Sequence, residues 1–234
     1  MADGRWQMAA RRRHKSFARS VVLVAVVAFV FVVSASAASA HYYATATLPG
    51  SAFFGVSADA RVNNIGINTG SDFMNNEIWA IDGGTWVETG IHKGVGLQRC
   101  VTSYPAFFWA EGLPDGSFMC YASVAHASLN TYYQLSLDYL GQDLWITQAG
   151  SFSGTTNPVQ PVAVGLQGGI ETTTRSVHTC TSLTNMSYVD GDGNTIFGWS
   201  DSSHGDATLS ADNPPYITWV SAPSWQRAWA NESC

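Results

Sequence analysis

Short segments in which apolar and polar residues alternate dominate the chain after residue 40. They are rich in Thr, Val, Ile, Tyr and Trp, and Gly, Asn, Asp or Pro stand between them. A period of two is typical of β-strands with one buried face. A short helix is considered only for residues 224–230. We therefore predict that residues 41–234 form a single domain, an antiparallel β-sandwich of two stacked sheets. The expected strands include EIWAI, TWVETGI, AFFWAE, FMCYASVAHAS, YYQLSLDYL, LWITQAG, PVAVGLQGGIETTT, MSYV and TIFGWS.

Residues 1–40 have the composition of a secretory signal peptide. An arginine-rich start precedes the apolar run VVLVAVVAFVFVV at residues 21–33, and small residues follow it up to Ala40. Ala38 and Ala40 fit the pattern at which such peptides are cleaved. The apolar run is shorter than the ~20 residues that cross a bilayer. The sequence thus predicts a secreted protein that begins at His41 and has no stable membrane anchor after cleavage.

Removal of this segment leaves a strongly acidic chain. Six of the 11 Lys and Arg residues lie in it, but only one of the 17 Asp and Glu residues, so the remainder carries a formal charge of −11. An acidic surface disfavours nucleic acid as a partner. We expect a monomer without a cofactor, whose partner is an extracellular polypeptide or polysaccharide.

Four cysteines, an even number, fall in the exported part: Cys100, Cys120, Cys180 and Cys234. Two disulfides are expected in an oxidising compartment, and the sequence allows three connectivities. The favoured pairing joins Cys100 to Cys120, because the strand AFFWAE between them can return to its neighbour, and leaves Cys180 for Cys234. The spacing fits no metal site, and we predict none.

The stretch NNEIWAIDGGTWVETGI, at residues 75–91, predicts a hairpin that turns at Gly83 and Gly84. In this register Trp79 lies opposite Glu88. Because side chains alternate between faces, Ile78, Ala80, Val87 and Ile91 form a core face. The other face collects two carboxylates and two tryptophans, namely Glu77, Trp79, Ile81, Trp86 and Glu88. Such a face suits a groove for an extended polymer, although it is also compatible with an ordinary surface.

Three motifs occur in an order that resembles the glutamic peptidases called eqolisins. They are WAIDGGTWVETGI, then SYPAFFWAEGLPDG at residues 103–116, then GGIETTT at residues 168–174. The resemblance implies a concanavalin-like jelly roll and a secreted enzyme that cleaves polypeptides in acid. Glu171 falls at the position of the catalytic Glu of that family. The other matching positions are Asp82, Gly83, Thr89, Gly90, Trp109, Glu111, Pro114 and Asp115.

One departure from the motifs changes the expected chemistry. The catalytic Gln of the family is replaced by Glu88, and LQGGIE stands where the family has Ala-Glu-Trp before its Glu. Two carboxyl groups on neighbouring strands would share a proton, as in aspartic peptidases. We therefore hypothesise that Glu171 is a general base and Glu88 a general acid. The predicted substrate-binding residues are Glu77, Trp79, Trp86, Trp109 and Glu111.

Two other functions remain open from the sequence. A protein that kept the groove but lost the catalytic Gln would be a glycan- or peptide-binding module without activity. A glycoside hydrolase is the second alternative, since Glu77 and Glu88 would lie ~7–8 Å apart as diagonal neighbours, near the spacing of inverting enzymes. The motif DGDGNT at residues 190–195 partly matches a calcium loop, but a hairpin turn is favoured there.

Overall fold

The computed structural model separates the chain into two compact units, Met1–Ser39 and Ala40–Cys234. The predicted signal peptide lies outside the described residues. Within them the second unit is all β-structure, as predicted, and no helix is long and apolar enough to cross a membrane. The described residues are 41–67, 70, 72–95, 100–174, 178–201, 205–212, 216–222 and 225–230.

Among the described residues all strand pairs are antiparallel, and many of them join strands that follow one another in the chain, as hairpins do. The strands, in chain order, are β1 (Tyr42–Gly66), β2 (Phe73–Asp82), β3 (Thr85–Val95), β4 (Val101–Gly112), β5 (Phe118–His126), β6 (Tyr132–Gly141), β7 (Leu144–Ala149), β8 (Phe152–Thr155), β9 (Ala163–Thr172), β10 (His178–Asp190), β11 (Thr195–Phe197), β12 (Ser200–Asp201), β13 (Gly205–Asp206), β14 (Thr208–Ala211), β15 (Tyr216–Ala222) and β16 (Trp225–Ala230).

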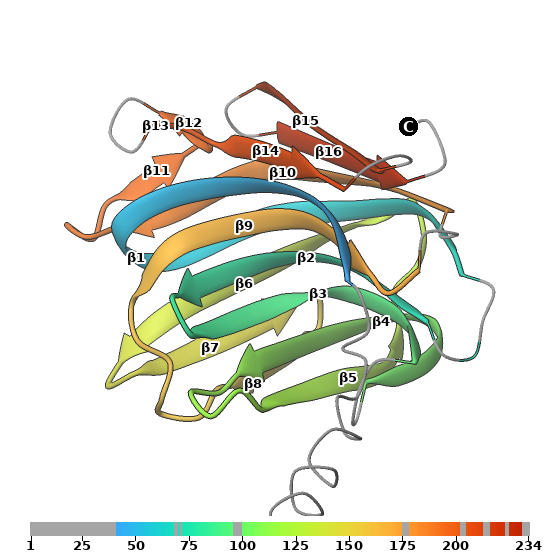
Figure 1. Ribbon diagram of the computed structural model, residues 1–234, viewed down its shortest axis with the longest axis horizontal. Coiled ribbons are helices and arrows are strands. Elements are labelled where there is room, and N and C mark those ends of the chain that lie inside the picture. The colour runs from blue at the N-terminus through green and yellow to red at the C-terminus, as the bar shows by residue number, and fades with distance from the viewer. Residues whose placement is uncertain are drawn as a thin grey trace, which may run out of the picture. The chain divides into compact units, whose positions relative to one another are not determined.

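The long strand β1 belongs to both layers of the sandwich. Its first part pairs with β14 and β9, and its second part pairs with β10 and β6. A register shift between Pro49 and Phe53 marks the change of partners. One layer therefore runs β14-β1-β9-β2-β3-β4-β5, and the other runs β8-β7-β6-β1-β10-β16-β15 (Figure 1). The predicted two-layer antiparallel sandwich is confirmed.

The hydrophobic core fills the space between the layers. The face of β2 and β3 that the sequence assigned to the core is buried, with Ile78, Ala80, Val87 and Ile91 at 2% exposure or less. The other layer contributes Leu135, Leu137, Trp145 and Leu183 to the same cluster, and β1 contributes Ala44, Ala46 and Leu48. The opposite face of β1, β9, β2 and β3 is consequently free to form a site.

The β2–β3 hairpin has the predicted register. Trp79 pairs with Glu88 and Glu77 pairs with Gly90. Gly83 takes a positive φ of 50° in the turn, which is the conformation that glycine adopts without steric cost. Gly90 is required for a different reason, because an added Cβ would meet the backbone of Glu77 at 2.8 Å. The hairpin turn expected in DGDGNT is also present, where the Asp190 N–H donates to the Asn194 carbonyl at 3.1 Å.

The helix considered for residues 224–230 is wrong, because Trp225–Ala230 forms strand β16. This strand pairs with β10 on one side and with β15 on the other. A run of six residues is too short for its periodicity to distinguish a helix from a strand. The backbone hydrogen bonds to a neighbouring strand on each side stabilise the extended conformation here.

The disulfide between Cys100 and Cys120 is present, with a Cα–Cα distance of 5.6 Å. It ties the residue before β4 to β5 at the edge of the first layer. Cys180 is also disulfide-bonded, whereas its predicted partner Cys234 lies outside the described residues. The disulfides are compatible with an extracellular protein.

We expect the double variant C100A/C120A to lower the free energy of unfolding by about 3 kcal/mol. The bond joins residues separated by 20 positions, so it removes the entropy of a loop of that length from the unfolded chain. Urea denaturation of the wild type and of the variant measures the difference. A loss below about 1 kcal/mol would contradict this account.

A candidate active site on one sheet face

A cavity of about 650 Å³ lies against the face of the first layer that points away from the core. Aromatic side chains form much of its wall, and Gln167 and two glutamates add polar groups to it. The aromatic residues are His41, Tyr43, Phe73, Trp79, Trp86, His92 and Phe118. This composition, apolar walls with a few converging polar groups, is typical of a small-molecule or peptide site.

The alternation of side chains along four neighbouring strands builds this cavity. Glu171 on β9 is paired with Tyr43 on β1 and with Asn75 on β2. Trp79 on β2 is paired with Gln167 on β9 and with Glu88 on β3. Residues paired across strands project to the same face, so these side chains converge although they are far apart in the sequence.

Three carboxyl groups meet in this region. One oxygen each of Glu77, Glu88 and Glu171 lie within 4.8 Å of one another. All three side chains are buried, with exposures of 0%, 6% and 8% in that order. The structure thus brings together the two residues predicted to be catalytic, and it adds Glu77 as a third buried acid.

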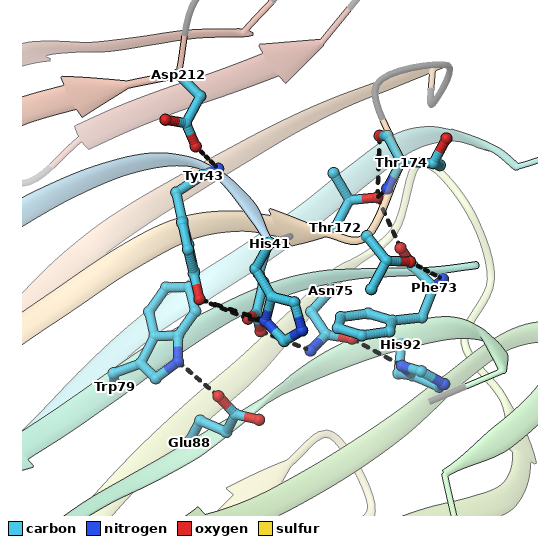
Figure 2. Close-up of polar contacts among 12 residues, drawn as sticks. His41, Tyr43, Phe73, Asn75, Trp79, Glu88, His92, Thr172, Thr174 and Asp212 are labelled. Atoms are coloured by element: carbon cyan, nitrogen blue, oxygen red, sulfur yellow. Dashed lines mark hydrogen bonds and ion pairs between the residues drawn. The ribbon is translucent and has the colours of Figure 1, made fainter. Parts of the chain in front are cut away.

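Glu171 is surrounded by hydrogen-bond donors. His41 Nδ1 lies 2.5 Å from Oε1, and the Tyr43 hydroxyl donates to the same oxygen at 2.8 Å. Asn75 Nδ2 approaches Oε2 at 3.5 Å. Figure 2 shows Tyr43 on β1, His41 just before β1 and Asn75 on β2 converging on one region. The hydrogen bond to Glu171 raises the pKa of His41, and burial raises that of the Tyr43 hydroxyl.

Glu88 has a single strong donor, the indole of Trp79. Nε1 of this residue lies 2.5 Å from Glu88 Oε2, and the contact is visible in Figure 2. Burial raises the pKa of Glu88 well above its usual range, and the charge of Glu171 raises it further. Glu88 therefore keeps its proton at pH values where an exposed glutamate has lost it.

Glu77 is the most isolated of the three acids. Neither of its carboxyl oxygens has a hydrogen-bond partner of good geometry among the described residues, although Asn75 and the two other acids lie near them. Burial raises the pKa of Glu77 well above its usual range, and the charges of Glu88 and Glu171 act in the same direction.

His92 holds the side chain of Asn75 in place. Its Nδ1 lies 2.7 Å from Asn75 Oδ1, and burial lowers the pKa of His92 to about 4. A neutral imidazole that donates from Nδ1 fixes the amide so that its Nδ2 faces Glu171. Sequence reasoning had assigned no site role to His41, Tyr43, Asn75 or His92. The one available signal was the position of Asn75, two residues before Glu77 on the same strand face.

Two of the predicted substrate-binding residues lie away from the cavity. Trp109 and Glu111 alternate along β4 with Phe108 and Ala110, so they project to the opposite face of the sheet. Trp109 stacks on Tyr121 with ring centroids 4.4 Å apart. Glu111 accepts hydrogen bonds from the Asn157 backbone N–H at 3.0 Å and from its side chain at 2.8 Å. We therefore leave both residues out of the proposed substrate site.

The remaining predicted residues are close to the cavity. Trp79 and Trp86 form part of its wall, together with Glu88 and Glu171. Glu77 contacts the other two acids but is fully buried, so the structure places it beside the reactive groups and out of reach of a bound polymer.

Comparison with known proteins gives matches only to solved structures. No model of a known protein family matches the chain, and no curated protein matches it. Scytalido-glutamic peptidase with a transition state analogue inhibitor is 14% identical, with a TM-score of 0.59 over 81% of this chain and 98% of that chain. This chain has the fold of a glutamic peptidase.

Two further structures with the glutamic-peptidase fold give the same result. Scytalido-glutamic peptidase with a peptide-based transition state analogue is 13% identical, with a TM-score of 0.56 over 80% of this chain and 97% of that one. SCP-B, a member of the eqolisin family, in complex with the tripeptide Ala-Ile-His, is 13% identical, with a TM-score of 0.53 over 81% and 98%. At such identities the likeness establishes the fold alone, which agrees with the predicted jelly roll.

Proposed function

We propose that this protein is a secreted acid hydrolase of polypeptides in which Glu88 and Glu171 act as a catalytic pair. The observation that carries the proposal is the approach of their carboxyl oxygens to within 4.8 Å at an aromatic-walled cavity. In the motifs that resemble eqolisins, Glu88 stands in the place of the catalytic Gln, so a protonated carboxyl group takes over the role of an amide.

Glu171 is the general base of the proposed reaction. Its carboxyl group is held in place by more hydrogen-bond donors than that of either other acid. The ionised group accepts a proton from a water molecule, and the water oxygen then attacks the carbonyl carbon of the peptide bond.

Glu88 is the acid that assists this attack. It donates its proton to the carbonyl oxygen as the tetrahedral intermediate forms. When the C–N bond breaks, Glu171 gives the water-derived proton to the leaving amine and Glu88 recovers its own proton. Both carboxyl groups thereby return to their starting states, and one water molecule is consumed for each bond cleaved.

The walls of the cavity suit an extended polypeptide. Trp79 and Trp86 present aromatic surface next to Glu88, and Phe118 extends it toward β5. The structures with the same fold described above hold peptide-like analogues or a tripeptide, which supports a peptide as the ligand. Trp79 has a second role, because its indole fixes the position of the Glu88 carboxyl group.

The geometry favours this chemistry over an inverting glycoside hydrolase. Such enzymes keep their carboxyl groups about 6.5–9.5 Å apart so that a water molecule fits between them. Oxygens of Glu77 and Glu88 lie within 4.8 Å, and Glu77 has no exposed surface with which to reach a sugar.

We expect the purified protein to cleave a denatured, alkylated protein substrate at about pH 4 and to lose this activity near neutral pH. Mass spectrometry of the products over time gives the cleavage sites and the rate. Absence of any new peptide at about pH 3–5 would reject hydrolysis. Saturable peptide binding under the same conditions without turnover would instead identify a binding module.

A further inference from the structure

The acid cluster lacks a matching number of positive groups. In the part of the chain that the structure describes, one ion pair reaches the three glutamates, that between His41 and Glu171. Burial of several like charges at short distance is unfavourable unless protons or cations neutralise them.

Glu77 provides a second, independent observation. Its side chain has no exposed surface, and neither carboxyl oxygen has a hydrogen-bond partner of good geometry among the described residues. A buried polar group without a partner costs free energy, and natural proteins rarely retain one without a ligand or a function. This carboxyl group is directed at Glu88 and Glu171, since oxygens of all three lie within 4.8 Å of one another.

We propose that Glu77, Glu88 and Glu171 bind one divalent cation, and that the ion is calcium. Carboxylate oxygens are ligands of hard cations. Two oxygens on opposite sides of Ca²⁺ are about 4.6–5.2 Å apart, against about 4.0–4.2 Å for Mg²⁺. The oxygens of the three acids lie within 4.8 Å of one another, which does not exceed the span across one Ca²⁺ ion, and calcium is chosen because its span is the larger of the two.

The surroundings supply the remaining ligands. Ca²⁺ takes six to eight oxygens. The Tyr43 hydroxyl lies 2.8 Å from Glu171 Oε1, and water can enter from the cavity, whose volume is about 650 Å³. The three acids lie on the adjacent strands β9, β2 and β3, so the ion would also join these strands at the centre of the layer.

This inference is independent of hydrolysis, although it concerns two of the same residues. A bound ion would occupy the space in which water and the peptide carbonyl must meet, so calcium would act as an inhibitor. Calcium binding is measured without substrate, and hydrolysis is measured in acid after treatment with a chelator. Either result can therefore fail while the other stands.

The test is isothermal titration of the chelator-treated protein with calcium chloride at about pH 7.5. We expect one ion per chain with a dissociation constant of roughly 10⁻⁵ to 10⁻³ M. E77Q removes one ligand charge and is expected to weaken binding at least tenfold. D192N is the matched control, since it removes an exposed acid from the 190–195 turn, the other stretch with calcium-like spacing, and it should bind as the wild type does.

Several results would overturn the proposal. These are absence of binding up to about 5 mM calcium, equal affinity in E77Q, loss of binding in D192N, or tighter binding of magnesium than of calcium. Circular dichroism establishes that E77Q is folded. If it is not, E88Q replaces it, with the same tenfold weakening expected.

Discussion

E171Q is expected to lower kcat/KM for polypeptide cleavage at about pH 4 by roughly a thousandfold. The amide cannot accept a proton from the attacking water, so the variant loses the general base. Gln has nearly the same size as Glu, and the Tyr43 hydroxyl can still donate to its amide oxygen. The loss should therefore appear in kcat, with the fold preserved. A fluorogenic peptide assay measures both constants.

E111Q is the control for this result. Glu111 is a buried glutamate like Glu171, with 1% exposure, but it lies on the opposite face of the sheet and accepts hydrogen bonds from Asn157. We expect E111Q to change kcat/KM by less than about twofold while lowering stability, since it weakens a charge-assisted hydrogen bond. Near wild-type activity in E171Q would reject the proposed base. A large loss of activity in E111Q would instead support the role in substrate binding that the sequence predicts for Glu111.

The hairpin at residues 75–91 was the part of the site that the sequence predicted best. Its register follows from local information alone, because the two-residue turn at Gly83 fixes which residues face each other. Alternation then assigns each side chain to a face. Trp79 and Glu88 could therefore be placed side by side before any long-range contact was known.

The approach of Glu171 to Glu88 depended on the resemblance to eqolisins rather than on local rules. Strand β9 lies between β1 and β2, and nothing in the intervening sequence sets that order. The burial of Glu77 was also not predicted, because its cross-strand neighbours Gly90 and Gly169 have no side chain to cover it.

Strand β1 was not among the expected strands, which explains why Tyr43 was overlooked. Pro49 and Gly50 interrupt the alternating pattern, and both residues usually weaken a strand. In the structure they stand next to the register shift after Pro49, where β1 leaves one layer for the other. The interruption is thus a bend within one strand rather than the end of it.

The faces assigned to Trp109 and Glu111 show the limit of a motif match. A motif identifies residues along the chain, but it does not say to which face of the sheet each side chain points. That face depends on which residues of the two neighbouring strands are paired, because a shift of the pairing by one residue reverses it. Ala110 pairs with Glu88, so Ala110 shares the face of the site and its two neighbours do not. Five residues, 96–100, separate β3 from β4 in the sequence, and they contain no two-residue turn motif from which this parity could be derived.

E88Q is expected to extend activity to higher pH. In the wild type the proton on Glu88 is required, and burial with the nearby Glu171 charge raises the pKa that governs its loss. Activity is therefore present below this raised pKa and falls as the pH rises through it. The amide of Gln donates at every pH, so the fall should disappear. Profiles of kcat/KM between about pH 3 and pH 8 compare the two proteins.

The indole of Trp79 determines how the introduced amide is oriented. Because Nε1 donates to the side-chain oxygen at position 88, the amide oxygen of Gln is held toward Trp79 and its NH₂ group is left for the substrate carbonyl. E88A, which has no donor, should lose at least about a hundredfold at pH 4. If E88Q is as inactive as E88A at that pH, the reaction needs an ionisable group at position 88, and the roles of Glu88 and Glu171 must be exchanged.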